Sequence, residues 1–64
     1  MLKLKGYRTM AGLTQIEMAE AIGLSVTGYA NKEKGDRQFT FEEMLKIKQV
    51  LAKKGIAVAL EDLS

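Results

Sequence analysis

The sequence predicts an all-α fold of four to five short helices, and three observations support this prediction. Helix-capping signatures recur along the chain, apolar residues follow them at helical spacing, and isolated glycines separate the segments. The one stretch with strand character, residues 56–60, has no evident second strand to pair with. Because the 64 residues contain no proline, repeat or low-complexity linker, we expect residues 1–64 to form a single small domain.

The first predicted helix covers residues 2–10, where Leu4, Tyr7 and Met10 lie at helical spacing. Gly12 follows this segment, and a glycine is common just past a helix C-terminus. The pattern therefore predicts that the chain turns after the first helix and that a second helix begins soon afterwards.

The second predicted helix has a well-marked start, because Thr14 and Glu17 have the spacing of a capping box. Gly23 is expected to end this helix at about residue 22. Ile16 lies off the apolar stripe and is expected to be partly exposed. The expected buried stripe consists of Met18, Ala19 and Ile22.

The third predicted helix begins only two residues after that glycine, since Ser25 is a favoured N-cap residue. It is expected to run to about Lys32 or Glu33 and to end in the turn at residues 34–36. Tyr29 is expected to point into the core, with its hydroxyl at the edge of the core.

The fourth predicted helix starts at Thr40, which forms a second capping box with Glu43. A lysine pair and Gly55 mark its end. We expect the tail to be extended and then to form a short helical turn at about residues 59–63. The expected core face of the fourth helix consists of Met44, Leu45, Ile47 and Leu51.

The composition excludes several classes of function. The chain has no cysteine and no histidine, so disulfides, Cys/His zinc sites and histidine-based catalysis are ruled out. The acidic residues are scattered, and helix capping already explains the cluster of Glu42 and Glu43. We therefore expect no enzymatic activity, no metal site and no cofactor.

Charge and hydropathy limit the expected partners and location. Ten basic and eight acidic residues give a net charge of +2, which is a weak indication of an anionic partner. The chain has no apolar run long enough to span a membrane, and its first residues lack the apolar core of a signal peptide. Together with the absence of cysteine, these features favour a cytoplasmic protein without a membrane partner.

Residues 15–34, QIEMAEAIGLSVTGYANKEK, resemble the helix-turn-helix motif of the phage repressor and Cro family, also called the XRE family. Ala19 matches the small fifth position of the motif, and Gly23 matches its ninth position, where the chain must turn. The apolar positions are matched by Met18, Ile22, Leu24 and Tyr29. The resemblance covers roughly residues 3–54 and implies a lambda-repressor-like fold, with the helix-turn-helix at about residues 14–33.

One position departs from the family pattern. The eighteenth motif position is usually apolar, but here it is Lys32. We expect its aliphatic stem to pack against the domain while its ammonium group reaches solvent.

The resemblance implies a sequence-specific regulator of transcription that binds double-stranded operator DNA. The helix at about residues 25–33 is expected to lie in the major groove while the preceding helix crosses the backbone. By family position Val26, Thr27 and Asn31 are expected to approach base edges, where Asn31 can pair with adenine. Gly28 and Ala30 are expected to let this helix approach the groove closely.

A second set of residues is expected to contact the DNA backbone without specifying sequence. Ordinary solvated side chains are the alternative interpretation of this set. It consists of Gln15, Ser25, Lys32, Lys34, Arg37, Gln38 and Thr40. The remaining lysines are expected to be solvated, namely Lys3, Lys5, Lys46, Lys48, Lys53 and Lys54. The resemblance also implies a structural ion pair between Arg8 and Glu33 that joins the first helix to the end of the third.

Two alternatives stay open from the sequence. The apolar C-terminal residues either form a homodimer contact or complete the core of the monomer, and they are Ile56, Val58, Leu60 and Leu63. The second alternative concerns function, because the same fold also serves as a protein-interaction module such as an antitoxin or an adaptor. The small set of base-facing side chains and the modest net charge favour that second interpretation.

Overall fold

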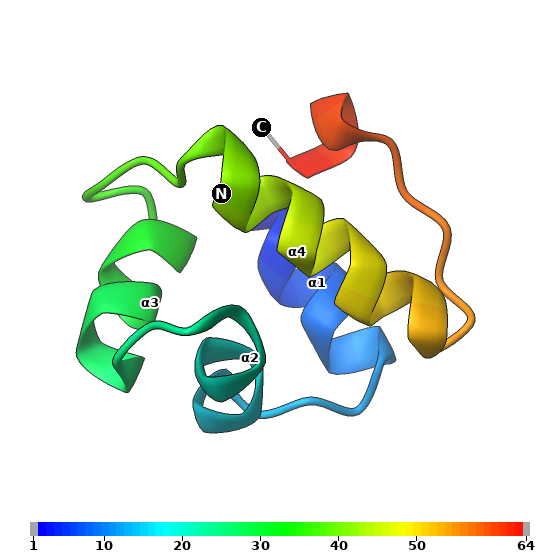
Figure 1. Ribbon diagram of the computed structural model, residues 1–64, viewed down its shortest axis with the longest axis horizontal. Coiled ribbons are helices and arrows are strands. Elements are labelled where there is room, and N and C mark those ends of the chain that lie inside the picture. The colour runs from blue at the N-terminus through cyan, green and yellow to red at the C-terminus, as the bar shows by residue number, and fades with distance from the viewer. Residues whose placement is uncertain (1, 64) are drawn as a thin grey trace.

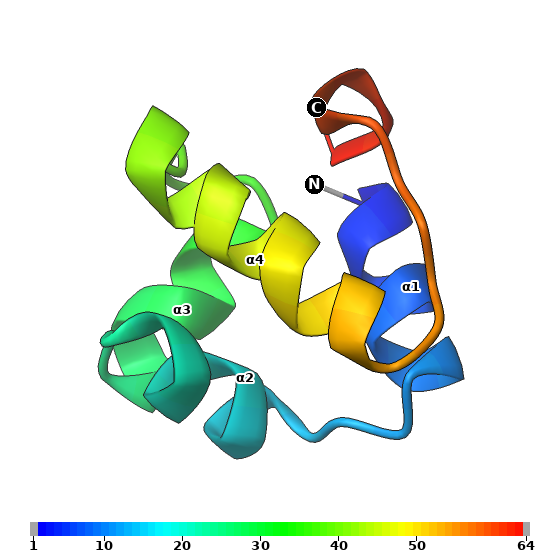
Figure 2. The ribbon, with the colours of Figure 1, turned by 45° about the vertical axis from the view of Figure 1, so that its right-hand side comes forward.

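The computed structural model describes residues 2–63 and contains four α-helices and a short 3-10 helix. They are α1 (Leu2–Met10), α2 (Gln15–Ile22), α3 (Val26–Glu33), α4 (Phe41–Lys53) and η1 (Leu60–Leu63). Helix α2 packs against both α3 and α4, and η1 closes the other side of the domain against α1 and α4 (Figures 1 and 2). No strand occurs in residues 2–63, so the predicted all-α class is confirmed.

Local capping interactions start α2 and α4, as the sequence predicted. The Thr14 hydroxyl accepts a hydrogen bond from the Glu17 amide at 3.1 Å, and the Glu17 carboxylate accepts one from the Thr14 amide at 2.9 Å. Thr40 and Glu43 make the same reciprocal pair at 3.1 and 2.9 Å. Each box satisfies two backbone donors that the first helical turn leaves unpaired.

The core forms where the four helices and the C-terminal turn meet. Met18, Tyr29, Ile47 and Leu51 are completely buried, and they come from α2, α3 and α4. Phe39 adds an aromatic contact, because its ring centroid lies 5.8 Å from that of Tyr29. This cluster therefore joins the loop before α4 to the inner face of α3.

The C-terminal segment belongs to this same core. Val58 and Leu63 are 6% and 0% exposed, and Ile56 packs against the buried cluster. Leu60 is only half-buried. Of the two alternatives left open by the sequence, the second therefore holds for Val58 and Leu63, since their side chains complete the monomer core.

Met10, for which the sequence indicated only helical spacing, is 72% exposed at the end of α1, while Leu13 packs against the core. One expectation about the core face of α4 is wrong. Leu45 is 37% exposed, and helix geometry explains why. It lies two residues, or roughly 200° of rotation, from the buried Ile47, so the two side chains point in nearly opposite directions.

No helix within residues 2–63 is both long enough and apolar enough to cross a membrane.

Candidate nucleic-acid interface

The turn between α2 and α3 is formed by local interactions. Gly23 has φ +79°, a left-handed conformation that strains other residues, and its amide donates to the Glu20 carbonyl. The Leu24 amide donates to the Ala19 carbonyl at 2.9 Å, and the chain changes direction between α2 and α3. The Ser25 hydroxyl then accepts a hydrogen bond from the Gly28 amide at 3.1 Å and starts α3. These bonds fix the angle between the two helices of the motif.

Helix α3 has a distinct outer face. Val26 is 42% exposed, Thr27 is exposed, and Asn31 is half-buried on the same helix. Tyr29 and Glu33 point inward and are almost completely buried. The residues predicted to approach base edges therefore lie outside the core, while their helix is held from its inner side.

Gly28 has a reason within the protein that the sequence alone did not indicate. A Cβ atom at this position would lie 3.0 Å from the Ser25 hydroxyl oxygen. A larger residue would press on the serine that caps α3. The absence of a side chain at residue 28 thus protects the start of the helix.

A buried carboxylate connects α3 to the first two helices. Glu33 accepts hydrogen bonds from Arg8 Nε at 2.8 Å, from Arg8 Nη2 at 3.2 Å and from the Tyr29 hydroxyl at 2.5 Å. It also accepts one from Gln15 Nε2 at 3.1 Å, and Arg8 Nη1 donates to the Leu13 carbonyl at 2.6 Å. The predicted pair of Arg8 and Glu33 is thus present in a larger network. Tyr29 is completely buried, as expected, and its hydroxyl reaches the polar network that borders the apolar core.

The network also sets the protonation states of its members. Burial acts to raise the pKa of Glu33, but hydrogen bonds from Arg8, Tyr29 and Gln15 outweigh it, so the pKa is lowered from its ordinary value. The hydrogen bond to Glu33 raises the pKa of Arg8. Burial and the bond to Glu33 raise the pKa of Tyr29. Glu33 therefore stays ionised and Tyr29 stays neutral at physiological pH.

Gln15 occupies the first position of α2, and its amide donates to Glu33 at 3.1 Å. This bond uses one of the two amide hydrogens, so one hydrogen and the carbonyl oxygen remain for an outside ligand. The first backbone N–H groups of α2 add a positive end to the same place. The predicted phosphate contact of Gln15 stays a prediction, now with a side chain whose position is defined.

Lys32 has a partner within the protein. Its ammonium nitrogen lies 2.7 Å from Glu43 Oε1 and 6.0 Å from the centre of the Phe39 ring. The side chain is 16% exposed, so its stem is packed as expected, but its charge does not point freely into solvent. The geometry therefore gives no support to the prediction that Lys32 contacts the DNA backbone.

The loop between α3 and α4 places several polar residues on the surface. The backbone amides of Asp36 and Arg37 both donate to the Asn31 carbonyl, which holds the loop against the end of α3. Lys34 Nζ lies 3.3 Å from Asp36 Oδ2. This ion pair is on the surface, since the two side chains are 65% and 62% exposed. Arg37 and Gln38 are exposed. This loop therefore continues the surface formed by the outer face of α3.

The two N-cap hydroxyls of this surface, on Ser25 and Thr40, already accept hydrogen bonds from their own helices. A hydroxyl can accept and donate at the same time, so each retains a hydrogen for a phosphate oxygen. Their predicted backbone contacts are chemically compatible with the capping role.

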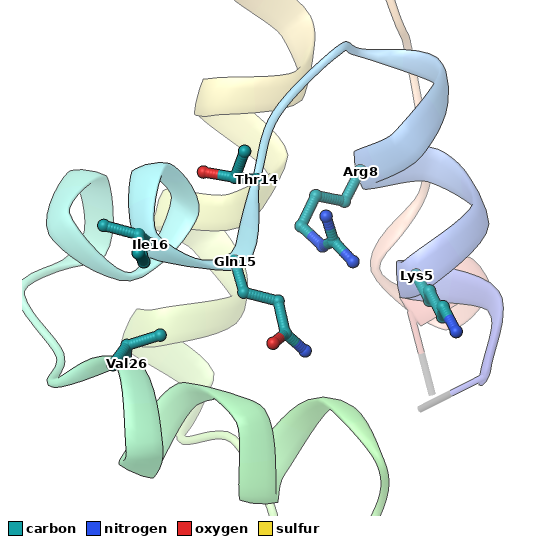
Figure 3. Close-up of a pocket in the computed structure, with 6 residues that line it drawn as sticks. All are labelled: Lys5, Arg8, Thr14, Gln15, Ile16 and Val26. Carbon is teal, nitrogen blue, oxygen red and sulfur yellow. The ribbon is translucent and has the colours of Figure 1, made fainter.

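An open depression lies where α1, α2 and α3 approach one another (Figure 3). It has a volume of about 610 Å³ and is lined by Lys5, Arg8, Thr14, Gln15, Ile16 and Val26. Sequence reasoning predicted DNA contacts for Gln15 and Val26 but treated Lys5 as a solvated residue. Its helical spacing from Arg8, three residues along α1, was the signal that places both on one face.

No group of three histidine, cysteine, aspartate or glutamate residues suited to a metal ion occurs in the part of the chain that the structure describes. The arrangement offers hydrogen-bonding groups, cations and an exposed helix, and the titratable groups with shifted pKa values serve caps and the buried network. This surface therefore has the groups needed to bind an anionic ligand.

Comparison with known families agrees with this geometry. Residues 4–56 match the model of a helix-turn-helix family. The chain belongs to this family, which is of the Cro/C1, or XRE-like, type and consists of DNA-binding regulators. No curated protein and no solved structure matches the chain.

Proposed function

We propose that this protein is a sequence-specific regulator of transcription, of the phage Cro or repressor type, that binds operator DNA in the cytoplasm. The observation that carries the proposal is the exposed outer face of α3, which is bordered by the loop at residues 34–40. An α-helix fits the major groove of B-form DNA, and the second helix of the motif is the one that enters it.

In this proposal α3 recognises bases through only three side chains. Asn31 donates to and accepts from an adenine edge, Thr27 makes one hydrogen bond, and Val26 packs on a thymine methyl group. The Glu33 network supports this recognition indirectly, since it holds α3 against α1 and α2 through bonds of 2.5–3.2 Å. A rigid helix loses little conformational entropy when it enters the groove.

Other groups position the protein on the backbone. Arg37, Lys34 and Gln38 extend from the exposed loop, while Gln15 and the cap residues Ser25 and Thr40 lie at helix N-termini. Helix N-termini favour anions because their N–H groups are unpaired and the helix dipole is positive there. These contacts supply affinity that depends on salt and carries no sequence information.

The protein is expected to act as a pair of copies on two half-sites about one helical turn apart, as is typical of helix-turn-helix regulators. Pairing increases affinity and selectivity for a small domain whose base contacts are few. The buried C-terminal segment is not offered as the contact between the copies, because Val58 and Leu63 are in the core.

A protein-interaction module of the same fold is the rival proposal. Phe41 is 61% exposed and Leu45 is 37% exposed, and the two lie one turn apart on α4. The exposed apolar side chains of Phe41 and Leu45 lie on α4, so DNA binding through α3 would leave them free. They could serve as a contact for a protein partner, as the rival proposal requires. Failure to bind duplex DNA at low salt would favour the rival.

The experiment that tests the proposal is selection of bound sites from a random duplex pool at moderate salt. A recurring motif, in particular a palindrome, is the expected result, and its half-site spacing reports the geometry of the pair. Weak binding with no recovered motif would contradict sequence-specific recognition. A matched pool selected with Asn31→Ala identifies the base that this residue contacts.

A further inference from the structure

We propose that Lys5 binds a backbone phosphate of the DNA duplex at the depression between α1, α2 and α3. This inference rests on the proposed function and extends the DNA-binding surface to α1, from which the sequence predicted no DNA contact.

Position is the first argument. Lys5 lines the same depression as Gln15 and Val26, which are the proposed backbone and base contacts at the starts of α2 and α3. Figure 3 shows Lys5 on α1, across the depression from Ile16 and Val26, with the side chain of Gln15 between them. A DNA strand that contacts the beginnings of α2 and α3 would therefore pass within reach of α1.

The direction of Lys5 on its helix is the second argument. Leu4 is completely buried, and Arg8 points toward α3, where it binds Glu33. Residues three apart lie on one face of a helix, so Lys5 shares the side of Arg8 that faces α2 and α3. Lys3 lies roughly 200° around the helix from Lys5 and does not line the depression. Of these two lysines, Lys5 is thus the one directed toward the proposed DNA surface.

Charge is the third argument. No carboxylate lines the depression, and the charge of Arg8 is compensated by Glu33 at 2.8 Å. Lys5 is exposed and has no ion-pair partner within the described residues. Its charge is therefore not neutralised by any side chain within residues 2–63. A lysine ammonium on a flexible stem binds phosphate as a point charge, without the exact orientation that a guanidinium needs.

Alternative ligands fit the depression less well. It is open rather than enclosed, and its apolar side consists of Ile16 and Val26. A nucleic-acid strand presents phosphates beside apolar sugar and methyl groups, which matches a cation on one side and apolar side chains on the other. We therefore assign the site to duplex phosphate.

The test compares Lys5→Gln with Lys3→Gln on a short mixed-sequence duplex, with binding followed by fluorescence anisotropy over a range of salt concentrations. Both variants remove one positive charge from α1, so long-range electrostatic effects are matched. Lys5→Gln is expected to reduce the slope of log K against log salt by about 0.9, the value for one phosphate contact. The loss of affinity relative to the wild type should shrink roughly 3.5-fold between 50 and 200 mM salt. Lys3→Gln should leave the slope unchanged, and Lys5→Arg should restore it.

The outcomes separate this inference from the proposed function. If the wild type binds with a clear salt dependence but the two glutamine variants have equal slopes, the role of Lys5 is refuted and the proposed function stands. If the wild type does not bind the duplex even at low salt, both are refuted. Thermal unfolding checks the fold of each variant, and because both lysines are exposed, we expect no change in melting temperature.

Discussion

Replacing Arg8 with methionine would test whether the buried network holds α3 in place. The side chains of Arg8 and Glu33 are 10% and 4% exposed, so the substitution removes the positive charge of Arg8 from beside a buried carboxylate. It also leaves the Leu13 carbonyl without the donor at 2.6 Å. Breaking a buried pair on one side costs about 3–5 kcal/mol, and the two bonds that Glu33 retains from Tyr29 and Gln15 favour the lower end.

A loss of about 3 kcal/mol is large for this protein. A domain of this length has a total stability of roughly 3–10 kcal/mol, and the melting temperature should fall by roughly 12–24 °C. Denaturant unfolding followed by circular dichroism at low temperature measures the difference. Lys34→Met is the matched control, because it removes one cation from an exposed pair at 3.3 Å and should cost less than about 1 kcal/mol.

The effect of Arg8→Met should also depend on pH. In the wild type the folded pKa of Glu33 lies below its ordinary value, so the stability from this group is present above pH 4.5 and is lost as the pH falls through the folded pKa. Without Arg8 that pKa rises, so the variant loses less stability on acidification. The difference between the two proteins should therefore be largest at neutral pH and narrow below pH 4.5. A stability difference below about 1 kcal/mol at neutral pH, or a difference of the same size at neutral pH and below pH 4.5, would contradict the proposed role of the Arg8–Glu33 pair.

The other predictions concern the DNA contacts and the glycines. Asn31→Ala should relax sequence preference at one base position at a cost of about 1–3 kcal/mol, measured by repeating the duplex selection. Arg37→Ala should weaken binding to all duplexes alike and lower the salt slope by about one, and equal losses without any change of preference in both variants would contradict this division. Gly23→Ala should destabilise the fold by about 1–2 kcal/mol, because φ is +79° there although nothing lies within 4 Å of the added Cβ atom. Gly6→Ala is its control: in open space within α1 it should stabilise the fold by about 0.5–1 kcal/mol in thermal unfolding, and a loss of stability would oppose the prediction.

Local signals in the sequence predicted the helix boundaries well. The boundaries of α2 and α4 follow from capping boxes whose two partners are three residues apart, so the information lies within a few neighbouring residues. Gly23 predicted the end of α2 for the same reason, since only local backbone strain favours glycine there. The short turn at Leu60–Leu63 was also predicted, at about residues 59–63.

The depth of individual side chains was predicted less well. Met10 and Leu45 are apolar and lie in helices, yet they are 72% and 37% exposed. Hydrophobic spacing identifies a helical face, but whether the edge of that face is covered depends on which helix packs beside it. The C-terminal segment is an example of such packing. Leu63 is completely buried because η1 folds back against α1 and α4.

Short-range features of the sequence were enough to predict the class of fold and the family, because caps, glycines and the spacing of apolar residues act over short distances along the chain. It also placed Val26, Thr27 and Asn31 on α3, outside the set of core residues. Most partners of the buried polar side chains became known only from the folded structure. The pair of Arg8 and Glu33 was expected from the family resemblance, but two further contacts were not. Gln15 also binds Glu33, and Lys32 binds Glu43, through contacts that join residues 18 and 11 positions apart.

Such contacts have no local signature, since their geometry depends on the relative placement of whole helices. The same placement, and not any motif, puts Lys5 beside the start of α2 and directs it toward the proposed DNA surface.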